Sequence, residues 1–200
     1  CQNLNSAEAK QKMILELYDT FFKTALPKTV QKLGIVYTPV PVVDFIIHSV
    51  NDALKKEFNR TLSDENVHIL DPFTGTGTFI VRLLESGYIK RKDMERKYEQ
   101  ELHANEIVLL AYYIATVNIE NAYHDLVGET DEYTPFDGIC LTDTFQINEN
   151  AENEDRIFSE IFPKNSERVV KQKNTPIRVI ISNPPYQKAQ KNANDNNQHN

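Results

Sequence analysis

Four short runs with the character of buried strands recur along this chain, and segments of helical periodicity separate them. The runs cover residues 67–70, 101–104, 137–141 and 177–181, and a polar residue stands at or near the end of each. Strands that alternate with helices predict a mostly parallel sheet. We therefore expect a Rossmann-like, doubly wound α/β fold, in which ligands bind beyond the carboxyl ends of the strands.

The helical segments can be placed from capping signals and apolar spacing. Thr38, followed by Pro39, is expected to cap a helix that reaches about residue 58. Its apolar face would carry Val43, Ile46, Ile47, Val50 and Leu54. Further helices are expected at residues 78–86, 92–98 and 107–123.

Two further helices are expected in more polar surroundings. Ile157, Ile161 and Phe162 predict one amphipathic helix within the charged stretch 148–175. Ser6 is expected to cap another that ends near residue 22. Residues 1–36 are therefore predicted to form an N-terminal helical extension.

Charge and cysteine content exclude some classes of function. The chain has 22 Lys and Arg against 29 Asp and Glu, a net charge of −7, which argues against a broad phosphate-gripping surface on this segment alone. Two cysteines are too few for a disulfide framework, and no Cys or His spacing suggests a metal site. No apolar run approaches the roughly 20 residues that cross a bilayer, so we expect a cytoplasmic protein without a membrane segment.

A glycine-bearing loop follows the first predicted strand. It comprises Asp71, Pro72, Phe73, Thr74, Gly75, Thr76, Gly77, Thr78 and Phe79. Ile80 stands where a dinucleotide-binding loop would have its third glycine, and no Gly-Lys pair follows for a nucleoside triphosphate. A carboxylate at the strand end favours a cationic or amine-bearing ligand over a pyrophosphate. The alternative is an ordinary strand-to-helix turn.

Two further carboxylates follow strands. Glu106 comes after the second predicted strand, where nucleoside-binding folds have an acid that accepts hydrogen bonds from ribose hydroxyls. Asp143 comes after the third, and its carboxylate could accept a hydrogen bond from the amino group of an adenine. Either residue could instead only stabilise the start of a helix.

A second motif, Asn183-Pro184-Pro185-Tyr186, follows Ser182 at the end of the fourth predicted strand. The amide oxygen of Asn183 and the carbonyl of Pro184 can both accept from one NH₂ group, and Tyr186 can stack on a planar ring. Accepting both protons favours the electron-rich geometry in which an exocyclic amine attacks a sulfonium methyl group. This chemistry needs no metal. In isolation the motif could also be a rigid Pro-Pro turn.

Together, the two motifs resemble those of the amino-group DNA methyltransferases that modify adenine, and their order is similar to the gamma arrangement. The resemblance implies an S-adenosylmethionine-dependent methyltransferase fold. It implies that residues 71–79 line the donor pocket, that Glu106 holds the ribose and Asp143 the adenine of S-adenosylmethionine. The opposite wall would be Tyr37, Thr38 and Pro39. The target base, flipped out of DNA, would meet Asn183, Pro184, Pro185 and Tyr186.

A narrower resemblance, carried by residues 18–22, 34–44 and 192–200, is to the methyltransferase portion of large single-chain helicase-methyltransferase restriction enzymes. It implies that residues 37–200 are the S-adenosylmethionine-binding and catalytic part of a methyltransferase domain, incomplete at its carboxyl end. Helicase, nuclease and target-recognition domains would accompany it and bind most of the DNA, so the isolated chain is expected to be inactive. Two alternatives stay open: methylation of RNA or of a protein glutamine amide, and a noncatalytic cofactor-binding or docking module.

Overall fold

A computed structural model describes residues 38–128, 133–147 and 162–185 of the chain. The predicted N-terminal extension, Tyr37 and Tyr186 lie outside these ranges. The chain divides into two compact units. One is formed by residues 38–183, and the other combines residues 1–37 with 184–200, of which only Pro184 and Pro185 are described.

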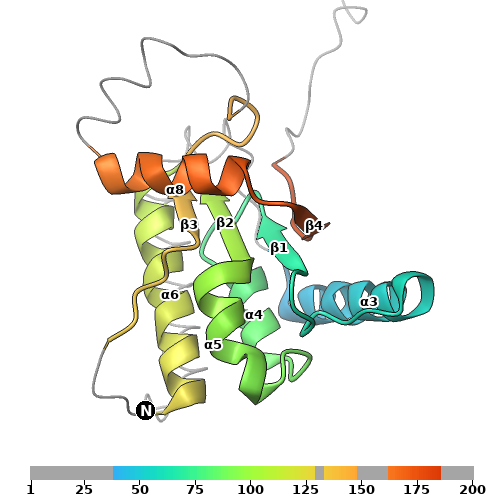
Figure 1. Cartoon of the computed structure of the whole chain (residues 1–200). Helices are drawn as coiled ribbons and strands as arrows, with labels where there is room; N and C mark the ends of the chain where they lie inside the picture. Colours follow the sequence, from blue (N-terminus) through green and yellow to red (C-terminus); the bar gives the residue numbers. More distant parts are fainter. Residues whose placement is uncertain (1–37, 129–132, 148–161, 186–200) are drawn as a thin grey trace, which may run out of the picture. The chain divides into compact units, whose positions relative to one another are not determined.

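The larger unit is built on a sheet of four parallel strands (Figure 1). The strands are β1 (His68–Asp71), β2 (Leu102–Glu106), β3 (Ile139–Leu141) and β4 (Ile177–Ile180). Their order is β3-β2-β1-β4, with Ile69 in register with Leu102 and Ala104 in register with Ile139. The predicted α/β class with a parallel sheet is confirmed.

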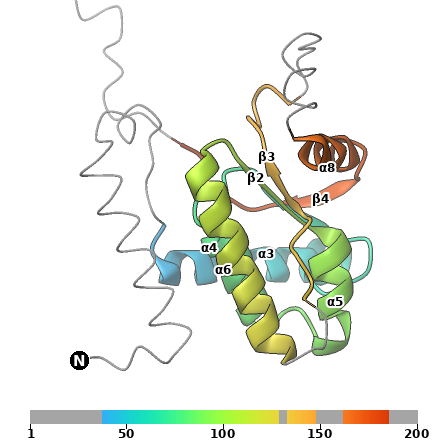
Figure 2. The same ribbon diagram turned by 90° about the vertical axis from the view of Figure 1, so that its left-hand side faces the viewer.

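Helices cover both faces of this sheet. They are α3 (Val40–Phe58), α4 (Thr78–Glu85), α5 (Met94–Arg96), α6 (Leu109–Val127) and α8 (Pro163–Lys173). Figure 2 shows α4 and α6 on one face of the sheet and α8 on the other. In the part of the chain that the structure describes, no helix is both long and apolar enough to cross a bilayer.

The strand order reverses direction beside β1. From β1 the chain passes through α4 to β2 and through α6 to β3, and it then returns through α8 to β4 on the other side of β1. The carboxyl ends of β1 and β4 are therefore neighbours at the point where the strand order reverses. This switch point is the place where open α/β sheets bind ligands.

Helices α3, α4 and α6 lie where the sequence predicts them and differ from the prediction only at their ends. Thr38 was expected to cap α3, but the N-cap is Pro39 and it makes no side-chain capping bond. Residues 92–98 form a 3₁₀ turn, Arg91–Asp93, then α5, then a π-helical turn, Lys97–Glu101, rather than one helix.

The helix expected from Ile157, Ile161 and Phe162 falls mostly outside the described residues and stays a prediction. Residues 148–161 are outside the described ranges, and α8 begins only after Phe162. The two side chains that α8 buries, Asn165 and Gln172, are polar. The Asn165 side chain accepts from the backbone N–H of Leu141 in β3 at 2.7 Å and donates to its carbonyl at 3.0 Å. Apolar spacing could not have revealed such a helix.

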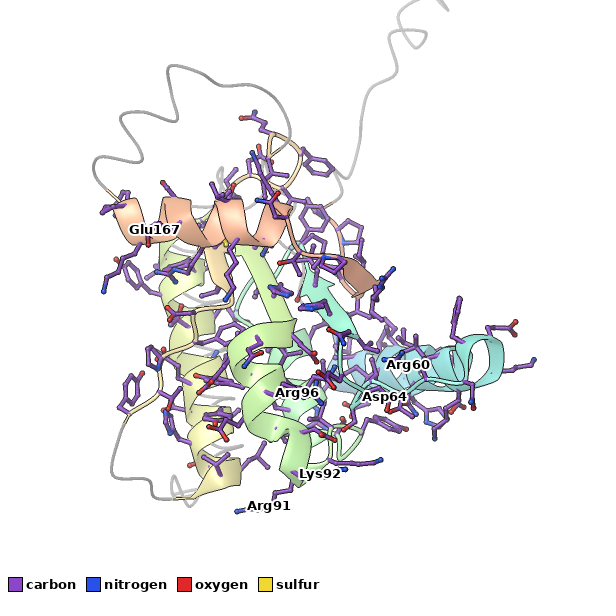
Figure 3. The ribbon with its side chains drawn as sticks, viewed as in Figure 1. Arg60, Asp64, Arg91, Lys92, Arg96 and Glu167 are labelled. Carbon is purple, nitrogen blue, oxygen red and sulfur yellow. The ribbon has the colours of Figure 1, made fainter. Side chains whose placement is uncertain are left out.

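The amino-terminal edge of the sheet is held by a buried lysine. Lys97 is fully buried, and its ammonium group donates to the carbonyls of Asp64 and Val67 at 2.7 and 2.8 Å and lies 2.7 Å from the carboxylate of Glu101. Arg60 pairs with Asp64 at 3.2 Å on the surface of the same loop (Figure 3). These contacts fix the loop before β1 against the segment before β2.

Candidate active site

The loop after β1, residues 71–78, turns tightly around Thr74. The Thr74 hydroxyl donates to the carbonyl of Asp71 at 2.9 Å, and the Gly77 amide donates to the carbonyl of Thr74 at 2.9 Å. Asp71 itself is fully buried at the end of β1. The loop, called the donor loop below, thus leaves the sheet and enters α4 within six residues, as the sequence predicts.

The two glycines of the donor loop have different structural roles. Both have positive φ, +57° at Gly75 and +89° at Gly77, a conformation that favours glycine. A Cβ at Gly77 would lie 3.2 Å from both Ala115 and Ile119, so this glycine lets α6 pack closely. A Cβ at Gly75 would meet nothing within 4 Å, so Gly75 keeps open space beside the loop.

The side chain of Glu106, the last residue of β2, accepts a hydrogen bond from the backbone of the donor loop. One carboxylate oxygen accepts from the Gly75 amide and the other from the Val108 amide, both at 2.8 Å. A carboxylate has about four lone-pair positions, and the amides of Gly75, Val108 and Ile107 all act on this one. The predicted bonds to two ribose hydroxyl groups stay a prediction.

The loop after β3 reaches the same edge of the sheet. The Thr144 hydroxyl donates to the carbonyl of Pro72 at 2.7 Å and accepts from the side-chain amide of Asn105 at 3.2 Å. The rings of Phe73 and Phe145 lie 5.2 Å apart. Asp143 accepts from the backbone amide of Phe145 at 2.9 Å, so the predicted capping role and a ligand role are both compatible with its position.

The end of β4 meets the end of β1. The Ile181 amide donates to the carbonyl of Leu70 at 3.0 Å, and the Ser182 hydroxyl donates to a carboxylate oxygen of Asp71 at 2.6 Å. Asn183 follows directly. The first loop motif and the beginning of the second, 111 residues apart in the chain, therefore meet at one edge of the sheet.

The electrostatics of this edge are acidic and incompletely paired. Burial raises the pKa of Asp71 to about 7, the hydrogen bonds from Ser182 and Phe73 oppose that rise, and Glu106 nearby adds to it. Burial also raises the pKa of Glu106. Among the described residues, three buried atoms at this edge have no hydrogen-bond partner: Asp71 Oδ2, Thr76 Oγ1 and Asn105 Oδ1.

Not every predicted site residue lies at this convergence. Phe79 is 4% exposed and belongs to the hydrophobic core, and Thr38 and Pro39 stand before α3, which packs against α4. Pro184 and Pro185 are exposed, but they belong to the other unit. The roles assigned to these residues, and those of Tyr37 and Tyr186, stay predictions.

Sequence reasoning missed the residues that tie the loops together. These are Ser182, Thr144, Asn105 and Asn118, whose amide donates to the carbonyl of Thr76 at 2.9 Å. Ser182 and Thr144 had a usable signal, since each is a small hydroxyl residue just beyond a strand. Asn118 had none, because a single polar residue inside a long helix shows no partner in sequence.

Comparisons with known proteins show what this chain is similar to. A family model described as N-6 DNA Methylase matches residues 9–200. A nuclease-deletion mutant of the Type ISP restriction-modification enzyme LlaGI, solved with a DNA substrate mimic, is 52% identical over 98% of this chain, with a TM-score of 0.80. The ATP-dependent Type ISP restriction-modification enzyme LlaBIII bound to DNA is 50% identical over 100% of it, with a TM-score of 0.82.

A third structure, a DrdV–DNA complex, is 40% identical over 97% of this chain, with a TM-score of 0.83. The chain spans only 16%, 14% and 18% of LlaGI, LlaBIII and DrdV, respectively. The comparison with curated proteins gave no match.

Proposed function

Because the chain belongs to the N-6 DNA methylase family, we propose that it transfers a methyl group from S-adenosylmethionine to the exocyclic amino group of adenine in DNA. In this proposal residues 37–200 supply the cofactor-binding and catalytic-motif part of the methyltransferase. The observation that carries it is the 2.6 Å hydrogen bond between Ser182 and Asp71, which joins the two motifs that this reaction requires. Methyl donor and acceptor amine must meet between them.

The described residues fit the proposed cofactor. The unpartnered atoms Asp71 Oδ2 and Thr76 Oγ1 and the open space at Gly75 suit a ligand with amine and hydroxyl donors. Asp71 would accept from the amine of the methionine part, Glu106 from the ribose hydroxyls, and Asp143 from the adenine. When bound, S-adenosylmethionine supplies an electrophilic methyl group on a positively charged sulfur.

The acceptor side of the reaction would be the work of the second motif. The amide oxygen of Asn183 and the carbonyl of Pro184 would accept from the two N–H groups of the adenine amine, which draws its lone pair out of conjugation with the ring. Tyr186 would stack on the base. Because the amine cannot reach a donor inside the helix, the base has to be flipped out of the duplex.

DNA binding would depend mainly on parts of the protein outside this chain. The net charge of −7 gives this segment little attraction for phosphates, and the three similar structures are restriction-modification or DNA complexes of much greater length. We propose that the full-length protein combines this methyltransferase part with helicase, nuclease and target-recognition domains.

Methyl transfer from isotopically labelled S-adenosylmethionine tests the proposal. The full-length protein is incubated in parallel with duplex DNA, with RNA and with a glutamine-containing protein acceptor. We expect label in DNA alone, recovered as N6-methyladenine after nucleoside digestion. Label recovered from RNA or from the protein amide, with none in DNA, would overturn the proposed substrate.

A further inference from the structure

We propose that Ser182 is a positioning residue, which aligns Asn183, the first residue of the second motif, with the donor loop through its hydrogen bond to Asp71. This inference rests on the proposed function and deepens it. It assigns a role to a side chain that neither binds the cofactor nor touches the base.

The backbone ladder between β1 and β4 ends just before the site. Its last bond is from the Ile181 amide to the carbonyl of Leu70, at 3.0 Å. Beyond it β1 turns at Asp71 and Pro72, and Pro72 has no N–H with which to continue pairing. The Ser182–Asp71 hydrogen bond takes the place of the next ladder bond.

This substitute bond determines where the catalytic motif starts. A serine side chain has one rotatable bond before its hydroxyl, so fixing the oxygen fixes the rotamer and the direction of the Cα–Cβ bond. The partner is rigid, because Asp71 is fully buried and the same carboxylate oxygen accepts from the Phe73 amide at 3.2 Å. The peptide that leads to Asn183 therefore leaves the sheet in one direction.

Because of this hydrogen bond, the position of Asn183 depends on whether the Asp71 carboxyl group is ionised. Three groups act on this carboxylate: the Ser182 hydroxyl after β4, the Phe73 amide in the donor loop, and the negative charge of Glu106 at the end of β2. A hydrogen bond to an ionised carboxylate is roughly twice as strong as one to a neutral group. An amine that binds Asp71 Oδ2 favours ionisation, so the motif is held most firmly when the donor loop is loaded.

A matched pair of variants isolates the hydroxyl. Ser182→Thr keeps it, whereas Ser182→Val has nearly the same shape and lacks it; Ser182→Ala adds a small, hydroxyl-free variant. Ser166→Ala is the control, since Ser166 lies in α8 and its hydroxyl donates to the carbonyl of Phe162, the N-cap residue of that helix, at 3.4 Å. All are made in the full-length protein and compared for thermal unfolding, for S-adenosylmethionine affinity by calorimetry across pH, and for single-turnover methyl transfer to DNA at saturating cofactor.

We expect Ser182→Val and Ser182→Ala to slow the single turnover by roughly 10- to 100-fold, the effect of losing a hydrogen bond to a charged group. The pH at which cofactor affinity falls should move upward in both, because the Ser182 bond lowers the pKa of Asp71. Ser182→Thr should restore both quantities to within a few-fold, and Ser166→Ala should match the wild type.

Two results would overturn the inference. One is a wild-type rate and a wild-type pH midpoint in Ser182→Val; the other is equal loss in the Val and Thr variants with equally lowered melting temperatures, which would indicate packing alone. If the wild-type protein neither binds S-adenosylmethionine nor methylates DNA, the proposed function itself fails and this inference fails with it. The wild-type measurement alone distinguishes that case.

Discussion

Buried charged side chains differ in their pairing between the amino-terminal and the carboxyl-terminal edge of the sheet. At the amino-terminal edge, the fully buried Lys97 has two carbonyl partners and the carboxylate of Glu101. At the carboxyl-terminal edge, the buried carboxylates of Asp71 and Glu106 form no ion pair with any described residue, and three buried polar atoms lack partners there.

The direction of the pKa shifts follows from this difference. Burial raises the pKa of Glu101, but hydrogen bonds and ion pairs with Lys97 and Arg96 outweigh it, and the pKa falls below its usual value. For Asp71, burial dominates and the pKa rises to about 7. Paired charge holds the fold together at one edge, whereas at the other edge Asp71 Oδ2 has no hydrogen-bond partner among the described residues. The predictions below test this division.

The largest effect is expected for Asn183→Ala in the full-length protein. The change removes an acceptor that the proposed reaction needs, so methyl transfer should fall by on the order of 1000-fold. Cofactor affinity should stay close to that of the wild type, because Asn183 serves the base. Single-turnover assays and calorimetry measure the two quantities, and parallel loss of both would indicate misfolding instead.

At the opposite edge, Lys97→Met should reduce stability rather than chemistry. The substitution removes one of the two cationic partners of Glu101 and leaves the carbonyls of Asp64 and Val67 without their buried donor, which costs about 3–5 kcal/mol in the free energy of unfolding. Chemical denaturation measures this loss. A loss below about 1 kcal/mol would show that the pair is solvated in solution.

Asp71 should make stability and cofactor affinity respond to pH in opposite directions. A carboxyl group whose pKa rises from 3.8 to about 7 on folding stabilises the folded state fully below pH 3.8, and this contribution is lost as pH rises through 7. The change is roughly 4 kcal/mol. Without cofactor, Asp71→Asn should therefore have a flatter stability profile than the wild type over this range.

Cofactor affinity should instead rise with pH through about 7, as Asp71 ionises to meet a positively charged amine. Calorimetry of the wild type across this range checks the trend. Equal pH slopes in the wild type and in Asp71→Asn, for stability and for affinity, would show that Asp71 does not titrate there.

Substitutions at the two donor-loop glycines should have different effects on cofactor binding and on stability. Gly75→Val places a side chain in open space, so it should block cofactor access and cost only the strain of positive φ, about 1–2 kcal/mol. Gly77→Val adds a collision with α6 and should destabilise further. Thermal unfolding and cofactor titration of both variants separate the roles, and retained binding in Gly75→Val would show that the loop is not the pocket.

The smallest effect is expected for Arg60→Ala. Arg60 and Asp64 are ion-paired at 3.2 Å, but their side chains are 46% and 33% exposed, so water screens the attraction. The loss of unfolding free energy should stay below about 1 kcal/mol. A denaturation curve beside that of Lys97→Met would measure how strongly burial increases the value of a charge contact at this edge.

Local pattern was enough to predict β1, α4 and the donor loop, because each depends on neighbouring residues. A short apolar run stops at Asp71, and glycine supplies the backbone conformation that the turn requires. The extent of α6 and the place of α8 were harder to predict. α8 is anchored to β3 by Asn165, a polar contact between segments 24 residues apart in the chain.

The sequence by itself determined the order of strands and helices and the chemical types of the residues that end the strands, since these follow from periodicity and from side-chain chemistry. Only the tertiary structure decided which groups meet. The Ser182–Asp71 bond, the grip of Glu106 on the Gly75 amide, and the pKa of Asp71 all arise from strand pairing and burial. Strand pairing and burial join residues 31 to 111 positions apart, and no local pattern encodes such contacts.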